Sequence, residues 1–93
     1  MPQENVQAIL RFKGRVQGVG FRFTTCQVAA GYAITGTVRN CSDGSVECIA
    51  EGTKREIRAF LADLLSQMDR YVRDHSCQWA PPSDRFTSFR VIY

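Results

Sequence analysis

The chain has 93 residues, of which 44% are hydrophobic and 23% charged, and its formal net charge is +3. A chain of this length makes one small domain, because it buries only about 60–65% of the surface that it exposes when unfolded. No apolar run approaches the roughly 20 residues of a membrane-spanning helix, and residues 1–5 lack the features of a signal peptide. We therefore expect a single domain over residues 1–93, in the cytoplasm, whose mild positive charge suits a small anion better than a nucleic acid.

The first half of the sequence predicts a strand, a glycine-rich loop, a helix and a hairpin. Residues 6–13 alternate between apolar and mostly polar side chains, which is typical of a half-buried strand. Residues 14–20 include three glycines and indicate a loop. Apolar residues recur at helical spacing from Phe21 onward, and residues 34–39 alternate again before an Asp-Gly turn and a returning strand, which Gly52 ends. The apolar stripe of the first helix consists of Phe21, Thr25, Val28, Ala29 and Tyr32.

The second half predicts a second helix between two strands. Thr53 and Glu56 have the spacing of a capping box, in which each side chain satisfies a backbone donor at the helix start. The stripe that follows has uninterrupted helical spacing and consists of Ile57, Phe60, Leu61, Leu64, Leu65 and Met68. Residues 71–79 indicate a less regular strand that two prolines stop. A short last strand closes the pattern with Phe89, Val91 and Tyr93.

The order of these elements predicts the fold. Two helices that are each apolar on one face must cover one face of a sheet. The sequence therefore predicts an α+β fold, the split βαβ sandwich of ferredoxin-like proteins, with an antiparallel sheet of four to five strands and two helices on one face.

The loop of residues 14–20 has the composition of an anion-binding site. Its glycines allow successive backbone N–H groups to turn inward, and the start of the following helix adds partial positive charge and unpaired N–H groups. Arg22, in the first helical turn, can hold a tetrahedral oxyanion through two hydrogen bonds. The Gly-Lys-Ser/Thr of a Walker loop is absent, and so is the second βα unit of a dinucleotide-binding fold. The loop is either a phosphate site that needs no metal or a purely structural turn.

The residues of this loop also resemble the signature of the acylphosphatase family. The string GRVQGVGFR, Gly14 to Arg22, is similar to that signature nearly letter for letter. Residues 36–40 (GTVRN), 43–47 (DGSVE) and 51–52 (EG) resemble the second block of the family, and residues 89–93 resemble its closing strand. The resemblance spans almost the whole chain. It implies an enzyme that hydrolyses small acyl phosphates to a carboxylate and inorganic phosphate, without a metal or a cofactor.

The resemblance further implies roles for individual residues. Arg22 would bind the phosphoryl oxygens, and Asn40 would hold the attacking water in line with the acyl–phosphate bond. Asn40 has the same parity as Ile34 and Val38, which places it on the covered face at the end of its strand. No side chain is an obvious general base, and in the mechanism of the family the water passes its proton to the phosphate of the substrate. The loop amides that would bind phosphate are those of Gln17, Gly18, Val19, Gly20 and Phe21.

Simpler interpretations of these residues remain open. Asn40 could be only a turn former, Arg22 a solvated helix residue and Arg15 a surface charge, and His75 is interpreted as structural or exposed rather than as a base. The alternative function is a phosphate-binding or RNA-binding module of the same fold without catalysis, or an accessory domain. RNA-binding sheets of this fold use exposed aromatic residues on their central strands. The face of the sheet that we expect to be uncovered carries no such aromatic residue. The side chains on it are those of Gln7, Arg11, Thr35, Thr37 and Arg39.

Four cysteines could suggest disulfides or a metal site, namely Cys26, Cys41, Cys48 and Cys77. No pair has the C-x-x-C spacing of zinc sites, and the lack of an export signal disfavours disulfides. We expect reduced thiols that mostly fill the core. We also expect a monomer whose partners are the acyl phosphate and inorganic phosphate, with no nucleic acid and no membrane.

Overall fold

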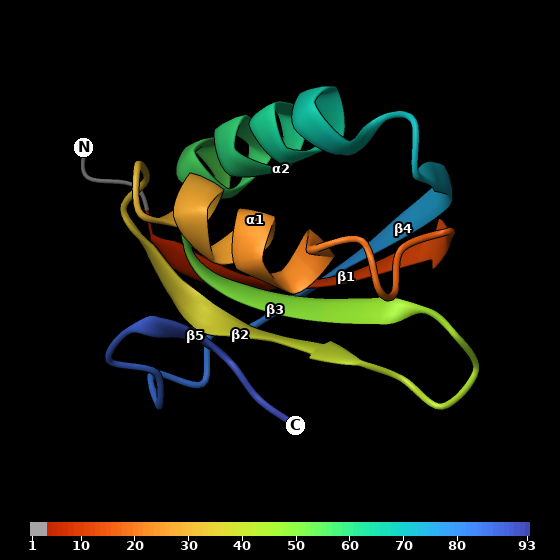
Figure 1. Cartoon of the computed structure of the whole chain (residues 1–93). Coiled ribbons are helices and arrows are strands. Elements are labelled where there is room, and N and C mark those ends of the chain that lie inside the picture. Colours follow the sequence, from red (N-terminus) through yellow and green to blue (C-terminus); the bar gives the residue numbers. More distant parts are fainter. Residues whose placement is uncertain (1–3) are drawn as a thin grey trace.

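A computed structural model describes residues 4–93. These residues form five strands and two helices, in the order β1 (Asn5–Gly14), α1 (Phe21–Ala29), β2 (Ile34–Asn40), β3 (Val46–Thr53), α2 (Lys54–Met68), β4 (Val72–Ala80) and β5 (Phe89–Val91). The strands make one sheet in the order β4-β1-β3-β2-β5, and both helices lie on the same face of it (Figure 1). The predicted ferredoxin-like α+β fold is confirmed. Four strands pair antiparallel, as expected, whereas β5 pairs parallel to β2.

The hydrophobic core lies between the helices and the covered face of the sheet. The rings of Phe12 on β1 and Phe21 at the start of α1 meet with their centroids 5.1 Å apart, and Phe60 of α2 packs against Phe89 of β5 at 5.8 Å. Full burial of each such side chain contributes about 1.5–3 kcal/mol, which is why the apolar stripes decide the face that the helices cover. The largest buried side chains include Phe12, Phe21, Phe60, Leu10, Ile57, Leu64, Val16, Val38 and Val46.

The ends of α1 and β3 differ from the sequence prediction. The helix ends at Ala29, because the amides of Gly31 and Tyr32 bond three residues back, to Val28 and Ala29, in a tightened turn. Tyr32 therefore lies outside the helix, although its side chain still packs against the core. β3 continues one residue beyond Gly52, which pairs with both neighbouring strands.

The capping box at the start of α2 is half formed. The amide of Glu56 donates to the Thr53 hydroxyl at 3.2 Å, as the spacing predicts. The Glu56 carboxylate, however, accepts a hydrogen bond from the amide of Ala33 at 2.8 Å. It therefore links the start of α2 to the segment before β2 instead of completing the box.

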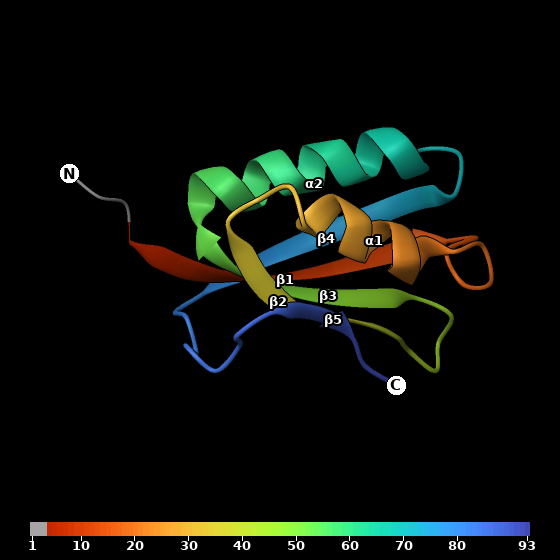
Figure 2. The same cartoon turned by 60° about the vertical axis from the view of Figure 1, so that its left-hand side comes forward.

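The connection between β4 and β5 crosses from one edge of the sheet to the other, on the face away from the helices (Figure 2). Glu51 of β3 holds this connection, with 5% of its surface exposed. Its carboxylate accepts from the amide and the hydroxyl of Ser83, both at 2.7 Å, from the amide of Asp84 at 3.0 Å and from Gln7 at 2.6 Å. Glu51 thereby fixes the path that brings β5 beside β2. Tyr93, predicted as part of the last strand, lies just beyond β5.

Arg11 and Arg39 lie on the uncovered face of the sheet, as the alternation predicts, and both pair there with Glu47. Glu47 accepts from Arg11 at 3.1 Å and from Arg39 at 3.0 Å, so one carboxylate joins three strands. These ion pairs are partly buried, with 14% of the Glu47 side chain exposed. The pairs place charged side chains of opposite sign side by side at the centre of this face.

Candidate active site

The glycine-rich loop has a backbone conformation that glycine favours. Gly18 and Gly20 have φ angles of 79° and 77°, in the left-handed region, and Gly20 is the N-cap of α1. A Cβ at either position would meet no atom within 4 Å, so the requirement is one of backbone conformation and not of space. Val16, only 1% exposed, fixes the loop to the core.

The side chain of Gln17 ties the loop to the hairpin between β2 and β3. Its amide nitrogen donates to the carbonyl oxygens of Cys41 at 2.8 Å and Ser45 at 2.9 Å. These carbonyls flank the hairpin turn that follows Asn40. Gln17 thus holds the loop against the end of β2, where Asn40 lies.

The amides from Gln17 to Phe23, in the second part of the loop and the start of α1, have no acceptor within the described chain. The first backbone bond of the helix runs from the Thr24 amide to the Gly20 carbonyl at 3.0 Å. The N–H groups of Gln17 through Phe23 donate to no carbonyl or side chain of residues 4–93. Such a run of unpaired N–H groups at a helix start is the arrangement that binds phosphate and sulfate in other proteins.

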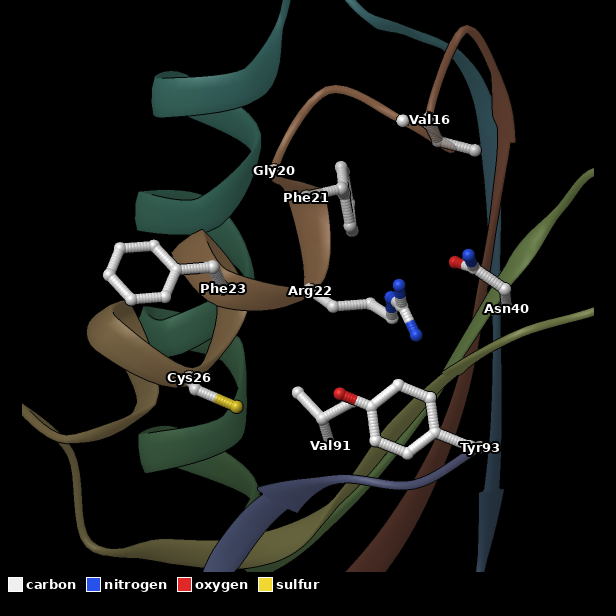
Figure 3. Close-up of a pocket in the computed structure, with 10 residues that line it drawn as sticks. Val16, Gly20, Phe21, Arg22, Phe23, Cys26, Asn40, Val91 and Tyr93 are labelled. Atoms are coloured by element: carbon white, nitrogen blue, oxygen red, sulfur yellow. The ribbon is translucent and has the colours of Figure 1, made fainter.

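Arg22 and Asn40 face one another across a pocket of about 300 Å³ (Figure 3). The Arg22 side chain extends from the first turn of α1 toward Asn40 at the end of β2. The pocket is bounded by the loop, α1, the end of β2 and the segment that follows β5. Its lining residues are Val16, Gly18, Gly20, Phe21, Arg22, Phe23, Cys26, Asn40, Val91 and Tyr93.

Arg22 and Asn40 lack the partners that protein groups of their kind usually have. Arg22 forms no ion pair with a residue of the described chain, and its guanidinium lies 5.2 Å from the centre of the Tyr93 ring. The Oδ1 atom of Asn40 is shielded from solvent and accepts no hydrogen bond within residues 4–93. Leaving a buried acceptor unpaired costs about 1–3 kcal/mol. Such a group beside a cation and a row of free amides is typical of one whose partner is a ligand or a water.

The predicted site residues thus fall into two groups. Arg22 and Asn40 lie in the pocket together with Gly18, Gly20 and Phe21. The side chains of Gln17 and Val19 do not line it: Gln17 bonds the hairpin, and Val19 packs against the core.

The sequence analysis missed one wall of the pocket. Val91 and Tyr93 enter it because β5 pairs parallel with β2, and no local pattern signals that pairing. Cys26 also lines the pocket. Its place there could have been predicted from the sequence, because it lies four residues after Arg22 and therefore on the same face of the helix.

Residues 4–93 contain no group of three or more His, Cys, Asp or Glu side chains that could hold a metal ion. Neither α1 nor α2 is long and apolar enough to cross a membrane. All four cysteines are unpaired. Cys48 is fully buried, and Cys26 and Cys77 pack partly against the core.

Fold and pocket define a small ferredoxin-like protein in which a glycine-rich loop, an arginine and a carboxamide converge. The family model for acylphosphatase matches residues 8–91. The acylphosphatase of Clostridium acetobutylicum is 38% identical over 87 residues, which cover 91% of this chain and 94% of the relative. That of Listeria welshimeri is 42% identical over 89 residues, covering 92% and 95%. The crystal structure of acylphosphatase from Bacillus subtilis matches with a TM-score of 0.85 at 29% identity, over 95% of this chain and 99% of that one. The chain belongs to the acylphosphatase family.

Proposed function

We propose that this chain hydrolyses small acyl phosphates, with Arg22 and the loop amides binding the phosphoryl group and Asn40 orienting the attacking water. The observation that carries the proposal is the convergence of three kinds of unpaired group in one pocket. These are the guanidinium of Arg22, the unpaired N–H groups of the residues between Gly18 and Phe23 that line the pocket, and the buried oxygen of Asn40.

The reaction asks for positioning and charge stabilisation more than for acid or base groups. The water oxygen forms a bond to phosphorus while the bond from phosphorus to the acyl oxygen breaks, and the electron pair leaves with the carboxylate. A carboxylate is a good leaving group, so no side chain need protonate it. The proton of the water passes to the phosphate oxygens of the substrate. The guanidinium and the loop amides stabilise the charge on the equatorial oxygens, which is the main task in phosphoryl transfer.

Two acyl phosphates and one substitution test this proposal. The protein should release inorganic phosphate from acetyl phosphate and benzoyl phosphate in excess chelator, and added phosphate should inhibit competitively. Arg22→Ala should lower kcat/KM at least about a thousandfold, as loss of an arginine that stabilises a transferring phosphoryl group does, and should abolish phosphate inhibition. Arg70→Ala, at an exposed arginine outside this pocket, is the matched control. Absence of phosphate release from both substrates, or wild-type turnover by Arg22→Ala, would contradict the proposal.

We further propose that the protein acts as a monomer in the cytoplasm and binds no nucleic acid. The four unpaired thiols are consistent with a reducing compartment. The uncovered face of the sheet, which RNA-binding relatives of this fold use, carries the ion pairs of Glu47 and is crossed by the connection that Glu51 holds. Sedimentation at micromolar concentration should give the mass of one chain. Salt-dependent RNA binding at the same concentration would contradict the proposal.

A further inference from the structure

The pocket has a second part, on the side of the Arg22 guanidinium away from the glycine loop. Cys26 lies one turn after Arg22 on α1, and its sulfur points toward Val91 (Figure 3). Val91 belongs to β5, where it is opposite Val38 of β2. This part of the pocket is therefore a groove between α1 and the last strand.

The walls of this groove carry no charged side chain beyond Arg22, and their one polar oxygen is the Tyr93 hydroxyl, which points toward Val91 (Figure 3). Cys26 and Val91 are half-buried and pack against the core. The ring of Tyr93 stands fully exposed on the far side, where one face meets the guanidinium. Phe23 lies on α1 at the rim of the pocket, but its ring points away from the groove (Figure 3). The surface of the groove is therefore made by Cys26, Val91 and the ring of Tyr93.

The groove begins where the acyl group of a bound substrate must leave the phosphate site. The free amides and Arg22 hold the phosphoryl group at one end of the pocket, and the water held by Asn40 attacks from the side opposite the leaving oxygen. The acyl group must therefore extend away from Asn40. The groove formed by Cys26, Val91 and Tyr93 is the part of the pocket that remains.

We infer that this groove binds the acyl group and selects acyl phosphates with an uncharged, apolar acyl chain or ring over those with a very short or an anionic acyl group. The inference rests on the proposed function and adds the class of substrate. Each methylene group buried in such a groove should raise kcat/KM about fourfold. A carboxylate on the acyl group would find no cation in the groove apart from Arg22, which the phosphoryl group already occupies, and would lose its hydration.

Three substrates with closely similar acyl chains test the selectivity without any substitution. Acetyl, butanoyl and succinyl phosphate differ in chain length and in one terminal carboxylate, and the leaving groups of the first two are of nearly equal basicity. Butanoyl phosphate has two more methylene groups than acetyl phosphate, so we expect its kcat/KM to be higher about fifteenfold, and to exceed that for succinyl phosphate by at least as much. Values of kcat/KM that agree within about twofold for all three substrates would overturn the role of the groove in selectivity, and the proposed function would still hold. Absence of phosphate release from all three would overturn the proposed function itself and this inference with it.

A substitution at Cys26 tests whether this groove is the source of the selectivity. Cys26→Leu places a larger side chain in the groove, so the ratio of kcat/KM for butanoyl over acetyl phosphate should fall toward one. Cys77→Leu is the matched control, because Cys77 is also a half-buried cysteine packed against the core but lies on β4, at the opposite edge of the sheet from β5. It should keep the wild-type ratio. A Cys26→Leu protein that keeps the wild-type ratio would overturn the assignment of the groove, and the substrate series on the wild-type protein decides the question if the variant fails to fold.

Discussion

The guanidinium of Arg22 lies 5.2 Å from the centre of the ring of Tyr93, so the first turn of α1 and the segment after β5 meet at the pocket. A cation over an aromatic face at an exposed site gains about 0.5–1 kcal/mol. The contact also limits the rotamers of an arginine that forms no ion pair within residues 4–93. Tyr93 therefore restrains the Arg22 side chain at the pocket and, under the proposed function, positions it for the phosphoryl group.

Loss of the aromatic ring at position 93 should weaken catalysis modestly. Tyr93→Leu should lower kcat/KM for acetyl phosphate about two- to fivefold, which corresponds to the free energy of such a contact. Tyr93→Phe keeps the ring and should stay near the wild-type value. Steady-state kinetics on acetyl phosphate, whose acyl group is too short to depend on the groove, check this. Equal kinetics for the Leu and Phe variants would show that the ring does not position Arg22.

Asn40 should affect turnover without affecting phosphate binding. Asn40→Ala removes the carboxamide that we propose orients the water, and we expect kcat to fall about a hundred- to a thousandfold, the usual effect of losing one positioned polar group in an active site. The inhibition constant of inorganic phosphate should change less than about threefold, since Arg22 and the loop amides remain. Asn5→Ala, at the exposed start of β1, is the control. Near wild-type turnover in Asn40→Ala would remove Asn40 from the mechanism.

Substitution of Gly20 should separate the binding role of the loop from its stability. A Cβ at Gly20 or at Gly44 meets no atom within 4 Å, and both residues have positive φ. Alanine at either position should therefore cost about 1–2 kcal/mol in the free energy of unfolding. Gly44 lies in the hairpin turn, outside the pocket. Only Gly20→Ala should also raise the inhibition constant of phosphate, about tenfold, as expected for one weakened hydrogen bond to a charged group. Urea denaturation and inhibition kinetics measure the two effects, and equal inhibition constants for both variants would contradict the role of the loop.

Glu51 should make stability depend on pH. Burial alone would raise its pKa, but the hydrogen bonds from Ser83, Gln7 and Asp84 outweigh burial and hold the pKa below its usual value. The stabilisation is therefore fully present above the pKa of an unfolded glutamate, about 4.3. It is lost as the pH falls through the lower pKa of the folded protein. Tm measured from pH 7 to pH 3 should fall less steeply for Glu51→Gln than for the wild type, although the variant is less stable at pH 7. Asp69→Asn, at an exposed carboxylate, should keep the wild-type slope. A Glu51→Gln protein with that same slope would show that the hydrogen bonds do not lower the pKa enough to matter.

Much of the fold follows from patterns of short range. The uninterrupted stripe from Ile57 to Met68 predicted α2, and alternation predicted β1 and the hairpin, because burial on one face imposes those periods. The end of α1 could not be predicted in the same way. Tyr32 continues the helical spacing, but the chain turns more tightly after Ala29 and still buries part of the tyrosine ring. Spacing alone does not distinguish these two routes to the core.

The pocket was predictable to the extent that its residues are close together in sequence. Arg22 follows the glycines directly, and the parity of Asn40 along its strand placed it on the covered face. Val91 and Tyr93 could not be assigned, because their place depends on a parallel pairing between β2 and β5 and on the hydrogen bonds of Glu51 that direct the connection. Such long-range contacts leave no periodic signal in the sequence.

The strand order has a consequence for the kinetics of folding. Of the strand pairs in residues 4–93, the β2–β3 pair joins consecutive strands, whereas β1 pairs with β3 and β4, and β5 with β2. Chain entropy must be lost over long loops before these distant pairs form, and mixed α/β domains with such high contact order fold more slowly than helical bundles. The walls of the pocket come from both halves of the chain. A partly folded chain with only the central hairpin in place therefore has Asn40 but neither the helix that carries Arg22 nor the strand that leads to Tyr93.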